Sequence, residues 1–95
     1  MIKHVVMWKF REKTEKEQKT FFAMLRRLYG TVPQLKGCEI RQNITPSKEN
    51  CDAIIIGEFE DVAALEEYLV DPRHRAVAAV CKPICVSRVA LDFDC

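Results

Sequence analysis

The first ten residues alternate between two sets of side chains, as the residues of a strand do. One set carries the larger side chains, Ile2, His4, Val6, Trp8 and Phe10. Apolar residues with a period of two predict a strand over Ile2–Phe10. Similar segments predict strands over Cys38–Ile44, Ala53–Phe59 and Val86–Phe93. Because Ile54–Ile56 leaves neither face of the third strand polar, we expect that strand in the centre of a sheet.

A helical spacing of apolar residues follows the first strand and predicts a helix over Thr14–Tyr29. Its apolar stripe consists of Phe21, Phe22, Leu25, Leu28 and Tyr29. Thr14 and Glu17 fit a capping box at its start. Gly30 suits the left-handed position that closes a helix.

A second helical region is interrupted by a proline. Val62, Leu65 and Leu69 have the spacing of a buried helix face, and Asp61 precedes them as a cap. Pro72 cannot continue that helix. Asp71 then suits the N-cap of another helix, with Pro72 at its first position. That helix presents His74, Val77 and Cys81 on one face.

The order of these elements is β-α-β-β-α(α)-β, which is the ferredoxin-like plan of an α+β domain. We therefore predict a four-stranded antiparallel sheet with its helices on one face. The other face would still carry Val5, Met7 and part of Ile54–Ile56. An apolar face of this kind marks an interface, so we predict a homodimer in which two sheets pack face to face.

Length, charge and cysteine content narrow the possible functions. We expect 95 residues to form one domain, residues 1–95, and the net charge is only +1. No basic block predicts a nucleic-acid partner, and no segment is long enough to span a membrane. The N-terminal apolar run Val5–Trp8 is too short for a signal peptide, so we expect a cytoplasmic protein. The five cysteines include no CxxC pair, and we predict neither a metal site nor a cofactor.

Tyr68 and His74 flank the helix break and are the side chains best suited to chemistry. A helix N-terminus carries partial positive charge, which disfavours the imidazolium form. We therefore expect His74 to be neutral near pH 7 and able to accept a proton. The alternative is that His74 only holds the bend together through a hydrogen bond.

Several of these segments resemble the stress-responsive dimeric α/β-barrel domain family. They are Ile2–Val6, Phe59–Asp61, Leu65–Leu69, Asp71–His74 and Arg88–Phe93. The family commonly has His before the proline, where this chain has Asp71. The resemblance implies a ferredoxin-like barrel that dimerises through its sheets. A few plant members of the family resemble polyketide cyclases, which bind an apolar ligand between sheet and helices.

Carried over to this chain, the resemblance implies that Tyr68 and His74 form an acid–base pair. It also makes His4 a polar group of the pocket. The expected lining is completed by Val6, Trp8, Phe22 and Leu25. Leu25 lies near the position of a second tyrosine in the plant enzymes, so the resemblance to their chemistry is partial.

Three functions remain open from the sequence. The first is a dimer that binds a small apolar molecule and possesses cyclase or isomerase activity. The second is a non-catalytic, stress-associated dimer whose own aromatic side chains fill the pocket. The third is a relative of the cofactor-free monooxygenases or haem-degrading proteins, by analogy of fold alone.

Overall fold

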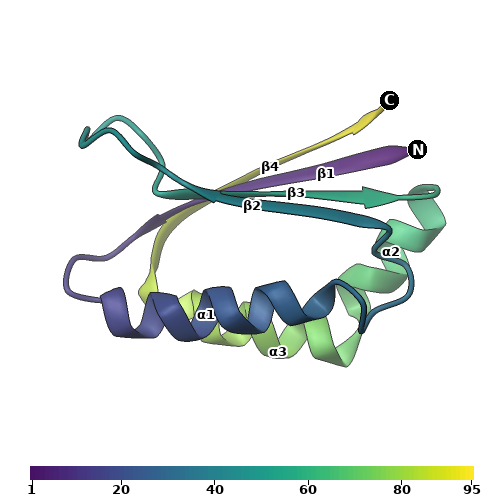
Figure 1. The fold of residues 1–95 in the computed structure, drawn as a ribbon, viewed down its shortest axis with the longest axis horizontal. Helices are drawn as coiled ribbons and strands as arrows, with labels where there is room; N and C mark the ends of the chain where they lie inside the picture. The colour runs from purple at the N-terminus through teal and green to yellow at the C-terminus, as the bar shows by residue number, and fades with distance from the viewer.

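The computed structural model covers all 95 residues. Its strands are β1 (Ile2–Phe10), β2 (Gly37–Gln42), β3 (Ala53–Phe59) and β4 (Cys85–Asp94). Its helices are α1 (Glu15–Leu28), α2 (Val62–Val70) and α3 (Pro72–Cys81), and a 3₁₀ turn, Lys82–Ile84, joins α3 to β4. The strands form an antiparallel sheet in the order β2-β3-β1-β4. The helices cover one face of it (Figure 1). The predicted ferredoxin-like α+β plan is confirmed, and β3 lies inside the sheet as expected.

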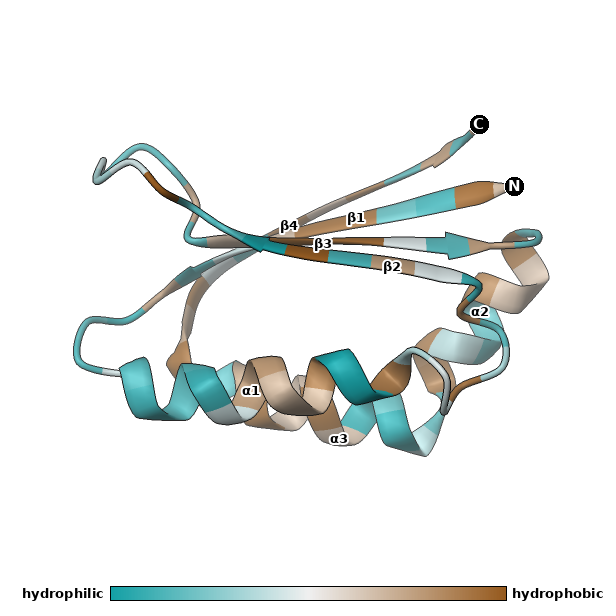
Figure 2. Ribbon diagram, in the orientation of Figure 1, coloured by the Kyte–Doolittle hydropathy of each residue, from teal (hydrophilic) through white to brown (hydrophobic).

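The core lies between the sheet and the helices. Alternate side chains of β1 are buried there, namely His4, Val6, Trp8 and Phe10. From α1, Phe21 meets Trp8 edge to face, with ring centroids 5.1 Å apart. Figure 2 shows apolar residues in the middle of the sheet and polar residues in the β2–β3 loop and the first turns of α1.

The face of the sheet that points away from the helices is also apolar. The register of β1, β3 and β4 gathers these side chains there: Val5, Met7, Ile54, Ile56, Val89, Leu91 and Phe93. We call this set the outer face. On β4, Leu91 is 64% exposed and Val89 50% exposed. This exposure is unusual for large apolar side chains that lie side by side.

The start of α1 differs from the prediction. The helix begins at Glu15, and the Thr14 side chain does not cap it. Instead the Thr14 hydroxyl donates to the backbone oxygen of Arg11 (2.6 Å) and accepts from Gln18 Nε2 (2.9 Å). The capping box is therefore wrong, because these two contacts use the hydroxyl. Gly30 does take the left-handed conformation, with φ 91°.

Two further predictions, for the buried face of α2 and for the end of β2, are wrong in detail. Val62 is 55% exposed, and the buried face of α2 is formed by Leu65 and Tyr68. Strand β2 ends at Gln42, before Ile44, which is 93% exposed. In both cases an apolar residue at the end of an element lies beyond the surface that the element buries.

The helix break forms as predicted. Asp61 caps α2, since its side chain accepts from Ala64 N. Asp71 ends α2 and caps α3, where its side chain accepts a hydrogen bond from the backbone N–H of Arg73. No helix of the structure combines the length and the apolar character that crossing a membrane requires.

Candidate functional site

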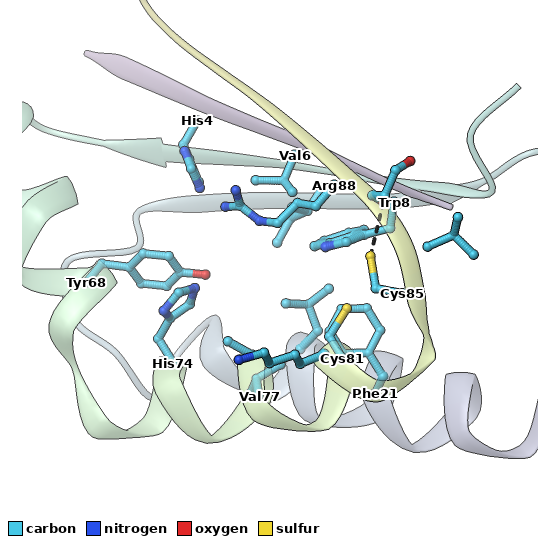
Figure 3. Close-up of a pocket in the computed structure, with 16 residues that line it drawn as sticks. His4, Val6, Trp8, Phe21, Tyr68, His74, Val77, Cys81, Cys85 and Arg88 are labelled. Atoms are coloured by element: carbon cyan, nitrogen blue, oxygen red, sulfur yellow. Dashed lines mark hydrogen bonds between the residues drawn. The ribbon is translucent and has the colours of Figure 1, made fainter. Parts of the chain in front are cut away.

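A cavity of about 450 Å³ lies between the helix-covered face of the sheet, α3 and the first half of β4. Most of its wall is apolar and includes Val6, Trp8, Phe21, Leu25, Ile55 and Val77. Polar side chains gather at one end, namely His4, Tyr68, His74 and Arg88 (Figure 3). An apolar wall with a few convergent polar groups is the usual form of a small-molecule site.

Most of the side chains that the sequence analysis proposed for a pocket line this cavity. They are His4, Val6, Trp8, Leu25, Tyr68 and His74. Phe22 does not line it. Its side chain packs against Phe10, with ring centroids 5.8 Å apart, and Phe21 faces the cavity instead. Successive residues of a helix point about 100° apart, so only one of the two phenylalanines faces α3 and the cavity.

Tyr68 and His74 meet across the helix break. Tyr68 is in the last turn of α2 and His74 is in the first turn of α3. The backbone N–H of Asp71 donates to the Tyr68 carbonyl (3.1 Å) and shapes the turn between them. The two rings lie with centroids 4.4 Å apart and planes inclined by 46°. Both side chains therefore reach the polar end of the cavity together.

The surroundings of His74 favour its neutral form. Burial lowers the pKa of its imidazole, and the nearby His4 and Arg88 lower it further. The hydrogen bond to the Leu69 backbone oxygen and the charge of Asp71 act in the opposite direction. We expected a neutral ring from the helix N-terminus, whereas the largest cause of the lowered pKa is burial.

The tautomer of His74 follows from its partner. Nδ1 lies 3.3 Å from the Leu69 carbonyl oxygen, which can only accept a hydrogen bond. Nδ1 therefore carries the proton in the neutral ring. The lone pair of Nε2 is left to accept a proton or a hydrogen bond.

Tyr68 has the opposite character. Its side chain is 3% exposed, and burial raises the pKa of its phenol, with Cys38 adding to this effect and Arg88 opposing it. The phenol is therefore neutral at pH 7. Its hydroxyl makes no hydrogen bond to another residue of the chain and is directed into the cavity (Figure 3). Tyr68 can donate to an oxygen of a bound molecule.

A second pair of polar side chains completes the polar end. His4 is 5% exposed, and its Nδ1 forms a hydrogen bond with Asp92 Oδ1. The β1–β4 register places these two residues directly opposite each other. The His4 ring lies with its centroid 6.5 Å from that of Tyr68.

Asp92 and Arg88 also belong to this region, although the sequence alone did not predict them there. Both lie on the side of β4 that faces the helices, opposite His4 and Trp8 respectively. The alternation along β4 indicates that Arg88 and Asp92 share a face, because residues 88, 90 and 92 point to the same side of the strand. It becomes useful only when β4 is paired with β1 in the correct register. The structure contains no group of three or more His, Cys, Asp or Glu side chains that could hold a metal ion.

The fold and the cavity together define a ferredoxin-like α+β domain with an apolar cavity between sheet and helices. The family model described as the Stress responsive A/B Barrel Domain matches residues 2–95. The chain belongs to this family. No curated protein matches the sequence.

Several solved structures share the fold. A dimeric ferredoxin-like protein of unknown function from Thermobifida fusca has 22% identity and a TM-score of 0.88, over 99% of this chain and 90% of that one. A family member from Mesorhizobium loti has 23% identity and a TM-score of 0.82, over 99% and 95%. Hydroxynitrile lyase from Passiflora edulis has 18% identity and a TM-score of 0.86, over 97% and 90%.

Proposed function

We propose that this protein binds a small, largely apolar molecule in the cavity and acts on it by proton transfer of the cyclase or isomerase type. The observation that carries the proposal is the meeting of Tyr68 and His74, with ring centroids 4.4 Å apart, at the polar end of an apolar cavity of about 450 Å³. A neutral base and a neutral donor beside one bound molecule are the two groups that such a step requires.

In the proposed step, Nε2 of His74 removes a proton from an acidic C–H or hydroxyl group of the ligand. Tyr68 donates a hydrogen bond to the oxygen on which negative charge develops. The imidazolium then returns the proton to another atom of the ligand, so that no co-reactant is consumed. A positioned base accelerates such a reaction by roughly 10²–10⁴-fold, which suits a substrate that is already activated.

Two observations weigh on the alternatives. The cavity of about 450 Å³ argues against a pocket that is filled by the chain's own aromatic side chains. The Passiflora edulis neighbour is a hydroxynitrile lyase, so this fold is compatible with catalysis. Neither observation favours the haem or oxygenase alternative.

Proton transfer can be tested without the natural substrate, by deuterium exchange into apolar ketones in D₂O. Acetophenone and longer aryl ketones are suitable probes, and NMR follows the loss of the signal from the C–H next to the carbonyl. We expect the protein to accelerate the exchange, and we expect His74→Ala to remove the acceleration. Tyr68→Phe should reduce it by roughly tenfold, because it deletes one hydrogen bond to the oxygen on which charge develops.

Arg75→Gln serves as the control, since Arg75 is exposed and does not line the cavity. A ketone that quenches Trp8 fluorescence but exchanges no faster than in buffer would refute the proton-transfer role and leave the binding role standing. Trp8 is the chain's single tryptophan and lines the cavity, so its emission reports binding there.

We also propose that two copies of the chain associate through the outer face. Two observations support this. The outer face contains exposed apolar side chains of β1 and β4, among them Met7, Val89 and Leu91. The neighbour from Thermobifida fusca is described as dimeric. Two outer faces packed against each other would remove these side chains from water.

A further inference from the structure

The lining side chains that carry a full charge are both cations. Two side chains that are always or normally cationic, Arg88 and Lys82, line the cavity, and so do the two histidines of the chain. The chain contains 14 acidic residues, yet none of them lines the cavity. The Asp92 carboxylate lies outside this lining, and its Oδ1 forms a hydrogen bond with His4. A site of this composition favours a negatively charged group.

Arg88 is the cation at the polar end. Figure 3 shows its side chain extending from β4 across the cavity, towards the space between His4 and Tyr68. Its charge also acts on the site, since it opposes the rise of the Tyr68 pKa that burial causes and adds to the lowering of the His74 pKa.

The guanidinium of Arg88 has no partner within the chain. It forms no hydrogen bond and no ion pair, whereas Arg73 binds Asp71 and the Thr31 carbonyl and Arg41 lies 3.3 Å from Glu39. A solvated arginine on an edge strand is the ordinary alternative. Arg88 differs from that alternative because it points over an apolar cavity, where an occupant would displace water from it.

We propose that Arg88 binds the carboxylate of an amphipathic ligand whose apolar body fills the cavity. This inference rests on the proposed function and specifies its substrate class as apolar carboxylic acids. The planar guanidinium can donate two parallel hydrogen bonds to the two carboxylate oxygens, which a lysine cannot do. The bound carboxylate would hold the adjoining carbon atoms at the end of the cavity where His74 and Tyr68 meet.

Matched pairs of ligands test the inference directly. Decanoate and decanamide share the apolar chain and differ in charge, as do 4-phenylbutyrate and 4-phenylbutyramide. Binding would be measured by isothermal titration calorimetry, with Trp8 fluorescence as the report that the ligand is in the cavity. For the unmodified protein we expect at least one carboxylate to bind about tenfold more tightly than its amide, because a charge-assisted hydrogen bond is stronger than a neutral one.

Arg88→Gln should remove this preference by weakening carboxylate binding about tenfold, while amide binding stays within about twofold. Arg88→Lys should give an intermediate affinity, since the charge remains but the two-pronged geometry is lost. Arg75→Gln removes the same charge from an exposed site outside the cavity and should leave the preference intact.

The outcomes separate this inference from the proposed function. Equal affinity for carboxylate and amide, or equal losses in Arg88→Gln and Arg75→Gln, would overturn the role of Arg88 while ligand binding in the cavity stands. If no ligand of either pair binds or changes Trp8 fluorescence, the cavity is not a site for apolar molecules of this kind. The proposed function and the role of Arg88 would then both fall.

Arg88 is exposed and unpaired, so its replacement should leave the fold intact, which circular dichroism would verify.

Discussion

At the scale of single residues, the two side chains proposed for proton transfer are a buried phenol, Tyr68, and a half-buried imidazole, His74. Burial lowers the pKa of His74 and raises that of Tyr68. The physical cause is the same in both cases, because low polarity disfavours the charged form of each group. The result is one acceptor and one donor, both neutral at pH 7, within contact of each other.

The lowered pKa of His74 has a consequence for stability. In the unfolded chain the imidazole titrates at its ordinary pKa of 6.5, and in the folded chain it titrates below that value. As the pH falls through 6.5, the unfolded state binds the proton first, so the free energy of unfolding decreases. We expect urea unfolding to show lower stability at pH 5.5 than at pH 7.5.

In His74→Gln this part of the decrease should disappear, and the two pH values should give more similar free energies of unfolding. Arg75→Gln should keep the full decrease, since it removes no titrating group from this pH range. Asp71 does not interfere, because its pKa is lowered to about 2 by the side-chain hydrogen bond from Arg73. An unchanged pH dependence in His74→Gln would show that His74 is not buried as a neutral base.

The sequence predicted single residues well where their environment is local, and less well where it depends on distant segments. Tyr68 and His74 were predicted to flank a helix break because Pro72 and Asp71 define it within a few residues, and the break forms there. The prediction that Phe22 lines the cavity was wrong. The choice between two adjacent phenylalanines depends on where α3 lies, and Phe21 faces the cavity instead. The contact of His4 with Asp92 joins residues 88 positions apart. It requires the register of two strands that no local pattern contains.

At the scale of elements, the break between α2 and α3 holds the site in place. The Asp71 carboxylate accepts from the backbone N–H of Arg73 (2.8 Å) and from its guanidinium (2.8 and 2.9 Å). The same guanidinium donates to the Thr31 carbonyl (2.8 Å), which follows α1. One aspartate therefore caps α3 and, through Arg73, ties its first turn to the segment after α1.

Replacing Asp71 should loosen the turn that carries His74. We expect Asp71→Ala to lower Tm by roughly a few degrees, because it removes the N-cap acceptor. Asp71→Asn should lower Tm less, since asparagine is an equally good N-cap and loses only the charge and the acceptor for Arg73 Nη2. Hydrogen exchange of the first α3 amides should be faster in Asp71→Ala than in Asp71→Asn. Equal exchange in the two variants would mean that the cap does not hold this turn.

The order and type of the elements followed from the sequence because each has a strong local signal. Alternation in β1, a wide apolar stripe in α1 and the proline break are all properties of short segments. The ends of elements were less certain. Thr14 fits a capping box by residue type, but the Arg11 carbonyl and Gln18 compete for its hydroxyl. Such competition depends on the conformation of the preceding loop, which the residue types do not specify.

At the scale of the whole molecule, the two faces of the sheet have different environments. Its helix-covered face forms the cavity, and its outer face carries exposed apolar side chains. A chain of 95 residues buries only about 60–65% of its unfolded surface. Burial of the outer face against a second copy would add stability that the small core lacks. Strand β4 contributes to both surfaces, with Arg88 and Asp92 on one side and Val89 and Leu91 on the other.

This arrangement predicts how a charge on the outer face would act. Leu91 pairs with Val5 in the β1–β4 register and is 64% exposed, so Leu91→Asp changes little within one copy. In a dimer packed through the outer face, the same aspartate would be buried without a partner. We expect light scattering to give a dimer for the unmodified protein. For Leu91→Asp we expect the dissociation constant of the dimer to be larger by roughly 100-fold or more.

Val62→Asp is the matched control, because Val62 is 55% exposed and lies at the start of α2, where an acidic residue is tolerated. It should remain a dimer. If Leu91→Asp also remains a dimer, the copies associate through another surface. The outer face would then be exposed in the dimer. Because Leu91 points away from the cavity, ligand binding by a monomeric Leu91→Asp variant would further show that one copy contains the complete site.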